Sequence, residues 1–487
     1  MIFGQRRAEI VGQVQWYRRD RPRRAVALLS ALVMVAATAW VHNARADERI
    51  PLIRIDVSER APATVGAELG RAYTDAFPEL ERRWDGWLHQ AFAADGGDPQ
   101  ARFDQLLETR IKPLRAEGVG EAARAEVEGM GSAWSLVGGN RLGDGALSHD
   151  EFWAAQLLAD LGLAGGGAGY AVFGDASADG GPIVGRTRDA LPSDAMPSDV
   201  GEPPLAITVR SDGRRHWALI GFAGQVAPLT GMNDRGLFVT HLPVPSSSRP
   251  DLPEAPRAIG FALRQALERQ ARVAAASSIA SQRFAEGQAL LIADPEQAAV
   301  LEQAAGARGR LRTDSSPTSA DLVWERTDQV AAVDCLALAS QRGDCRQLRD
   351  RYRWQRLRTL ARFGKNGPRA RPDDVAALLL DTANPPYPIF GPSTREVLIY
   401  QPGEDALYLR TFAPGTWSAA DAFDSKDQRA SASTLPLYRP LRMGADASSS
   451  GIGLGLLLIW GVLGLLAVAL IVIRLRLRLR IEPGDEP

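Results

Sequence analysis

The chain has 487 residues and is nearly neutral, with 57 Lys plus Arg against 58 Asp plus Glu. Proteins that bind nucleic acid usually carry a basic excess, so we expect no nucleic-acid partner. The five histidines are scattered and show neither an HExxH motif nor another metal-ligand spacing, so we expect no metal centre and no cofactor. Composition leaves the oligomeric state open.

Residues 1–46 have the layout of an export signal. Five arginines between residues 18 and 24 precede an apolar run at 25–41, and Ala44-Arg45-Ala46 follows as a small-x-small cleavage site. An uncleaved signal anchor is the alternative, because the apolar run is long for a cleaved signal and short for a membrane span. Either version places the main domain outside the cytoplasm, in the periplasm if the source is bacterial.

Residues 47–166 are expected to form a helical leader region. Apolar residues recur at helical spacing in 121–134, and Ser148 with Glu151 resembles a capping box that opens a helix ending at residue 160. A stretch rich in small residues and glycine follows at 162–169. The pattern then changes from helices to short strands.

The remaining elements predict an α+β domain over residues 167–440. Short apolar segments separated by Gly, Asp and Asn turns read as strands that pair locally, with helices between them. The expected strands are 170–173, 182–187, 205–210, 216–222, 236–241, 289–293, 298–302, 396–401 and 406–411. The expected helices are 257–270, 272–283, 344–363 and 372–380.

The two cysteines, Cys335 and Cys345, lie close together in the sequence. In an oxidising compartment they would form one local disulfide. Two free, buried thiols are the alternative, and the spacing does not decide between them.

The C-terminal region carries the features of a membrane anchor. Residues 451–473 contain no charged side chain, and as a helix these residues would be roughly 34 Å long, enough to cross a hydrocarbon core of about 30 Å. A buried core helix is the alternative. Arginines at 474, 476, 478 and 480 follow directly, so we expect the tail 474–487 to be cytoplasmic. Residues 441–450 are expected to form a flexible linker, and the chain to cross the cell membrane once.

Five motifs occur in order along the domain: GDASADG at 174–180, IVGRTRD at 183–189, TGMNDRGL at 230–237, LLIAD at 290–294 and VLE at 300–302. Taken together, they resemble the isopenicillin N acyltransferase-like (acyl-coenzyme A:aminopenicillanic acid acyltransferase) family of N-terminal-nucleophile (Ntn) hydrolases. The resemblance covers about residues 50–412 and implies a four-layer αββα sandwich. It also implies hydrolysis or transfer of an acyl group at an amide or thioester carbonyl.

In that family, autoproteolysis exposes a Cys, Ser or Thr whose own α-amino group serves as the base. Counting back from Asp189 puts the nucleophile position at Gly167, which has no side chain to attack with. A shift of register does not supply one, since the sequence contains no Ser, Thr or Cys from His149 through Ala176. The resemblance therefore indicates a vacant nucleophile position and an uncut chain.

Other family positions are partly kept. Arg186 and Asp189 match the residues that flank and orient the nucleophile, Asn233 matches an asparagine of the oxyanion site, and Arg351 loosely matches a later arginine. Each has a structural alternative. Arg186 and Asp189 would form an ion pair, Asn233 would complete a turn, and Arg351 would be a solvated helix residue.

Two functional hypotheses follow from these residues. In the first, the protein is a degenerate Ntn-fold member that binds an acyl or amide ligand, or a partner, outside the cytoplasm. In the second, it is an active amide hydrolase or N-acyltransferase that uses a non-standard nucleophile, for which Ser177 and Thr187 are the candidates.

Overall fold

The computed structural model describes residues 50–94, 96–190, 201–245, 251–341, 345, 347–383, 387–412 and 441–442. The expected export signal at 1–46, the span at 451–473 and the tail at 474–487 lie outside these residues. Within the ranges described, no helix is both long enough and apolar enough to cross a bilayer.

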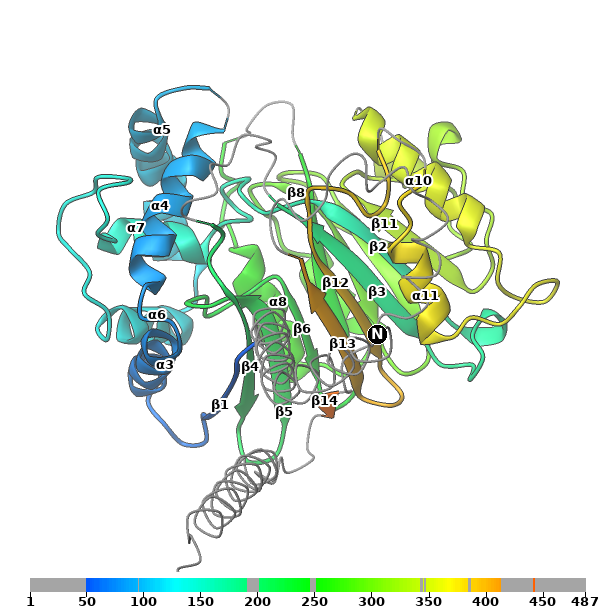
Figure 1. Cartoon of the computed structure of the whole chain (residues 1–487), viewed down its shortest axis with the longest axis horizontal. Coiled ribbons are helices and arrows are strands. Elements are labelled where there is room, and N and C mark those ends of the chain that lie inside the picture. The colour runs from blue at the N-terminus through cyan, green and yellow to red at the C-terminus, as the bar shows by residue number, and fades with distance from the viewer. Residues whose placement is uncertain are drawn as a thin grey trace, which may run out of the picture.

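Two sheets form the centre of the fold (Figure 1). The eight-stranded sheet has the order β1-β4-β5-β6-β7-β8-β9-β10, and the six-stranded sheet has the order β11-β2-β3-β12-β13-β14. The strands of the larger sheet are β1 (Leu52–Asp56), β4 (Leu205–Ser211), β5 (His216–Phe222), β6 (Thr230–Asn233), β7 (Phe238–Val244), β8 (Gly287–Ala293), β9 (Ala298–Gln303) and β10 (Arg310–Arg312). Those of the smaller sheet are β2 (Gly167–Val172), β3 (Ile183–Asp189), β11 (Gln329–Val333), β12 (Thr394–Gln401), β13 (Ala406–Thr411) and β14 (Leu441–Arg442).

The two sheets pack face to face through one apolar core. Side chains from the smaller sheet, such as Ala171 and Val184, meet side chains of the larger one, such as Leu242 and Leu291. Helices α10 (Leu348–Leu360) and α11 (Pro372–Leu379) cover the outer face of the smaller sheet. Helices α8 (Ile259–Arg269) and α9 (Ala276–Ala280) cover the outer face of the larger sheet. The layer order is therefore αββα, which is the order that the family resemblance implies.

The N-terminal region forms a helical group beside the larger sheet, drawn in blue and cyan in Figure 1. Its helices are α3 (Pro62–Ala76), α4 (Leu80–Ala93), α5 (Pro99–Leu106), two π-helical turns at Leu107–Ile111 and Leu114–Gly118, α6 (Glu121–Gly131) and α7 (His149–Gln156). Four buried tryptophans, Trp84, Trp87, Trp134 and Trp153, belong to the core of this group. The expected capping box at Ser148 and Glu151 is confirmed.

The expected leader region is not a separate helical unit. Strand β1 lies inside it and pairs in parallel with β4, at the edge of the eight-stranded sheet. A buried ion-pair network adds a second connection, since Glu126 of α6 contacts Arg210 of β4 at 2.6 Å and Arg264 of α8 at 2.7 Å. The leader is thus held to the sandwich by backbone pairing and by buried charges.

Several element boundaries differ from the sequence-based expectation. The helix expected at 272–283 is reduced to a 3₁₀ turn, Val273–Ala275, and α9, while α10 is shorter than the expected 344–363. Strands β1, β6, β10 and β11 were not expected, and β14 lies in the expected linker 441–450. Further 3₁₀ turns lie at Gly174–Ala176, Ala320–Leu322 and Ala339–Gln341. Cys335 and Cys345 form a disulfide, so the free-thiol alternative is wrong.

Candidate functional site

Gly167 is the first residue of β2, a central strand between β11 and β3. Its backbone N–H donates to both carboxylate oxygens of Asp334, at 2.9 and 3.0 Å. A Cβ atom placed on Gly167 would lie 2.1 Å from the backbone carbonyl oxygen of Thr187, and one on Gly166 would lie 2.1 Å from Oδ2 of Asp334. The expected nucleophile position therefore lacks a side chain and also lacks the space for one.

Charged side chains fill the region next to Gly167 on the α10 side of the sheet. Arg349 donates from Nη2 to Asp334 at 2.9 Å and from Nε to Asp350 at 3.2 Å. Burial, together with the nearby carboxyl group of Asp350, raises the pKa of Asp334 above its usual value. Asp334 was not singled out in the sequence, because it follows a strand that the pattern did not reveal.

Asp189 belongs to the same group. Its Oδ2 accepts from Nη1 of Arg353 at 2.5 Å, and its Oδ1 accepts from the hydroxyl of Thr394 at 3.0 Å. We call the residues Asp189, Asp334, Arg349, Asp350 and Arg353 the closed cluster. Arg349, Asp350 and Arg353 belong to α10, and the two arginines contact Asp334 and Asp189. Asp334 also accepts a backbone N–H of β2.

Arg351 does not reach the closed cluster. Its side chain is 41% exposed, and its Nε donates to the backbone oxygen of Cys345 at 2.6 Å. The arginine that contacts Asp189 is Arg353, two residues further along α10. The buried positions of this helix, 350, 353, 354 and 357, follow helical spacing and include Asp350 and Arg353. That spacing could have indicated the buried face of the helix. Because the face includes charged residues, the sequence does not show the usual division into an apolar and a polar side.

Arg186 and Asp189 lie on opposite faces of β3, so the alternative in which these two residues form an ion pair is wrong. Side chains alternate along a strand, and positions that differ by an odd number point in opposite directions. Arg186 instead donates from Nη2 to Oε1 of Glu396 at 2.7 Å. Arg188, on the same face, contacts Oε2 of Glu396 at 3.2 Å and Oε2 of Glu202 at 3.1 Å.

Asn233 has a structural role that uses its whole side chain. Its Nδ2 donates to the backbone oxygens of Leu267 and Gln270, at 2.8 and 2.7 Å. Its Oδ1 accepts from the backbone N–H groups of Arg235 and Leu237, at 3.1 and 3.0 Å. The side chain thus joins the end of β6 to α8, on the outer face of the larger sheet. The structure does not bring it to Gly167 or Arg186.

The two alternative nucleophiles are buried away from a reaction space. Thr187 accepts the backbone N–H of Ala168 at its hydroxyl, at 3.0 Å. Ser177 follows the 3₁₀ turn beyond the far end of β2, is fully buried, and its hydroxyl has no hydrogen-bond partner among the described residues. Neither residue lines the pocket described next.

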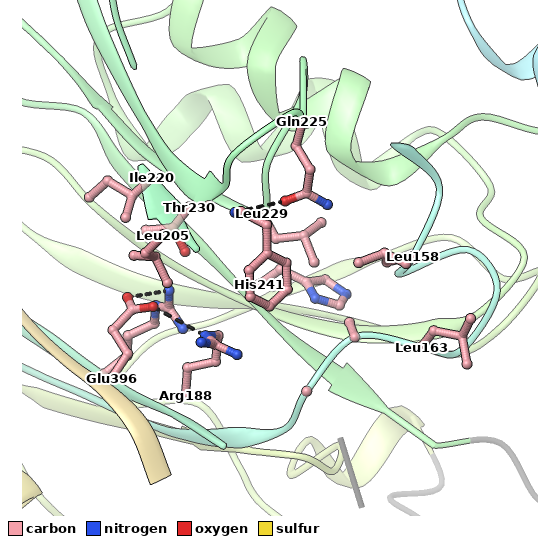
Figure 2. Close-up of a pocket in the computed structure, with 15 residues that line it drawn as sticks. Leu158, Leu163, Arg188, Leu205, Ile220, Gln225, Leu229, Thr230, His241 and Glu396 are labelled. Atoms are coloured by element: carbon pink, nitrogen blue, oxygen red, sulfur yellow. Dashed lines mark hydrogen bonds and ion pairs between the residues drawn. The ribbon is translucent and has the colours of Figure 1, made fainter. Parts of the chain in front are cut away.

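A pocket opens between the two sheets, on the opposite face of β3 from the closed cluster (Figure 2). It contains about 510 Å³ of empty space, including the part that is open to solvent. Strands β3 and β12 contribute from one sheet, and β4 to β7 from the other. Its large apolar side chains are Leu158, Leu163, Leu205, Ile220, Phe222 and Leu229. Its polar side chains are Arg186, Arg188, Gln225, Thr230, His241 and Glu396. We call this space the inter-sheet pocket.

His241 of β7 was not predicted as a site residue, yet it lies in the middle of the pocket in Figure 2. Burial, with the charge of Arg186 nearby, lowers the pKa of its imidazole to about 3. The imidazole is therefore neutral at physiological pH. Within the described part of the chain, neither Nδ1 of His241 nor Nε of Arg186 has a hydrogen-bond partner.

In the described ranges, no group of three or more His, Cys, Asp and Glu side chains has the arrangement of a metal site. The chemistry that the pocket offers is hydrogen bonding from Arg186 and His241, next to a wall of aliphatic and aromatic groups. Thr230 brings a hydroxyl to this lining, and that hydroxyl is hydrogen-bonded to the hydroxyl of Thr240 at 2.8 Å.

Comparison with known proteins does not identify a family. No protein-family profile and no curated protein sequence matches the chain. Among solved structures, a Caenorhabditis elegans ortholog of N-acylethanolamine-hydrolyzing acid amidase is similar at 13% identity and a TM-score of 0.35, over 48% of this chain and 93% of that one. A conjugated bile acid hydrolase from Clostridium perfringens is similar at 15% identity and a TM-score of 0.31, over 50% of this chain and 89% of that one.

Penicillin V acylase from Agrobacterium tumefaciens is similar at 14% identity and a TM-score of 0.28, over 50% of this chain and 82% of that one. With TM-scores this low, these likenesses do not decide the function or the family. The class of protein is stated from the fold itself: an α+β protein with two stacked sheets between helical layers.

Proposed function

We propose that the chain is a membrane-anchored, exported protein with a degenerate Ntn-hydrolase-like fold, which binds a small acyl or amide ligand without cleaving it. The collinear motifs from residue 174 to residue 302 and the αββα layer order support the fold relationship. The observation that carries the loss of catalysis is the closure at Gly167, where a Cβ atom would lie 2.1 Å from a backbone oxygen.

The chemistry of this fold type explains why that closure matters. One side chain serves as the nucleophile both for self-cleavage and for turnover. Loss of a catalytic nucleophile typically removes about six orders of magnitude in rate. The buried positions of Ser177 and Thr187 count against an active enzyme with a substitute nucleophile. The chain therefore stays uncut, and the leader remains attached through β1.

The inter-sheet pocket supports a ligand-binding role. Its six large apolar side chains suit an acyl chain, and Arg186 and His241 lie where a polar group would contact them. Such a protein would hold an acylated small molecule at the membrane surface rather than convert it.

Intact mass spectrometry of the purified protein tests the loss of maturation. We expect one uncut chain, apart from removal of an export signal, and no release of product from N-acyl amide or thioester substrates. Two fragments produced by cleavage near residue 167, or steady turnover of a substrate, would overturn the proposal.

The export and anchoring parts of the proposal rest on the sequence at 1–46 and 451–473. A protease added to intact spheroplasts would degrade the main domain and leave the C-terminal tail protected. Protection of the main domain would reverse the proposed orientation.

A further inference from the structure

We infer that the inter-sheet pocket selects an uncharged ligand and holds its polar group between Nε of Arg186 and Nδ1 of His241. This inference deepens the proposed function and rests on it. Two independent observations point to it. Two nitrogen atoms inside the pocket lack hydrogen-bond partners among the described residues, and the formal charges of the ion pairs beside the pocket add up to zero.

The unpaired atoms belong to side chains that solvent hardly reaches. Arg186 is 6% exposed and His241 is 7% exposed, and both line the inter-sheet pocket. Over the residues that the structure describes, Nε of Arg186 and Nδ1 of His241 lack a hydrogen-bond partner. Buried polar atoms cost free energy when they lack a hydrogen-bond partner. A polar group of a ligand in the pocket would supply partners for both nitrogen atoms.

The charges around the pocket cancel. Glu396 contacts both arginines, at 2.7 Å to Arg186 and 3.2 Å to Arg188, and Glu202 contacts Arg188 at 3.1 Å. These two cations and two carboxylates leave no formal charge to neutralise an incoming anion. A carboxylate ligand would therefore be buried without a counter-ion of its own, which costs more than burial of a neutral group.

The hydrogen-bonding character of the two nitrogens narrows the ligand further. The guanidinium Nε–H only donates, so the ligand must bring an oxygen acceptor. A neutral imidazole has one donor and one acceptor nitrogen, so Nδ1 is able to accept an N–H from the ligand. An uncharged amide supplies both groups, whereas an ester supplies only the acceptor. Apolar side chains such as Leu158, Leu163 and Phe222 would contact the rest of the ligand.

Isothermal titration of the full-length protein in detergent micelles tests the selection with three probes that share one acyl chain: N-methylhexanamide, methyl hexanoate and hexanoate. We expect the amide to bind at least about tenfold more tightly than hexanoate, with the ester between them. Hexanoate binding as tight as amide binding would overturn the inference and leave a ligand-binding pocket in place. Absence of binding by all three probes would overturn the proposed function as well.

The Glu202→Gln variant tests the charge argument. It removes one carboxylate at the edge of the ion-pair set, so we expect hexanoate affinity to rise about tenfold and amide affinity to stay within about twofold. The matched control is Glu268→Gln, because Glu268 contacts Arg264 at 2.8 Å on α8 and does not line the pocket. Unchanged hexanoate affinity in a folded Glu202→Gln protein would contradict the inference.

The His241→Leu variant gives an independent test if removal of Glu202 disturbs folding. It keeps similar volume but deletes Nδ1, so we expect amide affinity to fall about tenfold and ester affinity to fall less. Equal amide affinity in the variant and the wild type would overturn the role of His241. Thermal unfolding of each variant reports that it is folded.

Discussion

The two faces of strand β3 differ in how completely their polar groups are used. On the face toward α10, the carboxylates of the closed cluster contact arginines and backbone N–H groups. On the face toward the larger sheet, a pocket is open and two buried nitrogen atoms lack partners among the described residues. In this molecule, a fully paired polar cluster and an open pocket thus lie on opposite faces of one strand. Gly167 pairs with Arg188 and so belongs to the face toward the larger sheet, where the carbonyl oxygen of Thr187 leaves no space for a side chain.

The largest expected effect comes from breaking the closed cluster. Arg353→Ala leaves Asp189 buried without its cation, so we expect the free energy of unfolding to fall by about 3–5 kcal/mol. Urea titration followed by circular dichroism would measure it. The control is Arg351→Ala on the same helix, whose half-exposed side chain should contribute less than about 1 kcal/mol. Equal losses in both variants would mean that the contrast between these two arginines is wrong.

A methyl group at the nucleophile position tests the lack of space. Gly167→Ala puts a Cβ atom against the carbonyl oxygen of Thr187, so we expect a loss of about 3 kcal/mol in unfolding free energy. Gly138→Ala is the matched control, because a Cβ atom at that exposed glycine meets nothing within 4 Å. The difference in urea midpoint between the variants measures the effect. A Gly167→Ala protein as stable as the wild type would show that the site is able to hold a side chain.

The pocket face is expected to respond to pH through His241. Its folded pKa of about 3 lies below the unfolded value of 6.5, so the unfolded state binds more protons between these values. The stabilisation is complete above the unfolded pKa and is lost as the pH falls toward the folded one. Between pH 7 and pH 5 we expect the titration of His241 to lower the free energy of unfolding by about 2 kcal/mol.

Wild type and His241→Leu, compared at both pH values by urea unfolding, isolate this contribution. Arg186, Arg188 and Glu396 line the pocket around position 241 in both proteins, and the other carboxyl groups also titrate in both. The variant should therefore lose about 2 kcal/mol less than the wild type on acidification. Parallel curves would mean that the imidazole is not held neutral.

The smallest expected effect is a difference in stability between variants of the two buried hydroxyl residues, Thr187 and Ser177. Thr187→Val leaves the backbone N–H of Ala168 without its acceptor, so we expect a loss of about 1 kcal/mol. Ser177→Ala removes a buried hydroxyl that has no partner within the described ranges, so the change should be close to zero or stabilising. Differential scanning calorimetry would compare the two. A larger loss for Ser177→Ala would show that its hydroxyl has a role that the structure does not explain.

Much of the fold was predictable from local pattern. The hairpins β2–β3, β4–β5 and β12–β13 join strands that are near neighbours in the sequence, with turn residues between them, so alternation and turn composition located them. Strand β1 was missed because its partner β4 is far along the chain. Strand β11 was missed because its short, small-residue run is fixed by pairing with β2 rather than by its own pattern.

The candidate site was less predictable. Asn233 was chosen from a motif, but its hydrogen bonds to the chain around Leu267 show a structural role that no local pattern reveals. The residues that line the pocket with His241 come from strands of both sheets, so His241 becomes a pocket residue only when the two sheets pack together. Arg353 rather than Arg351 contacts Asp189, and this becomes visible only when the buried face of α10 is known.

The sequence by itself determined the absence of a nucleophile at residue 167 and the two cysteines available for pairing, because these follow from which atoms the residues carry. It also indicated the α+β class, because strand and helix periodicity are local properties. Only the tertiary structure decided that position 167 is closed, that Arg186 and Asp189 face apart, and that His241 is buried beside a cavity. Those properties depend on which distant segments pack together, and the same local sequence is compatible with more than one such packing.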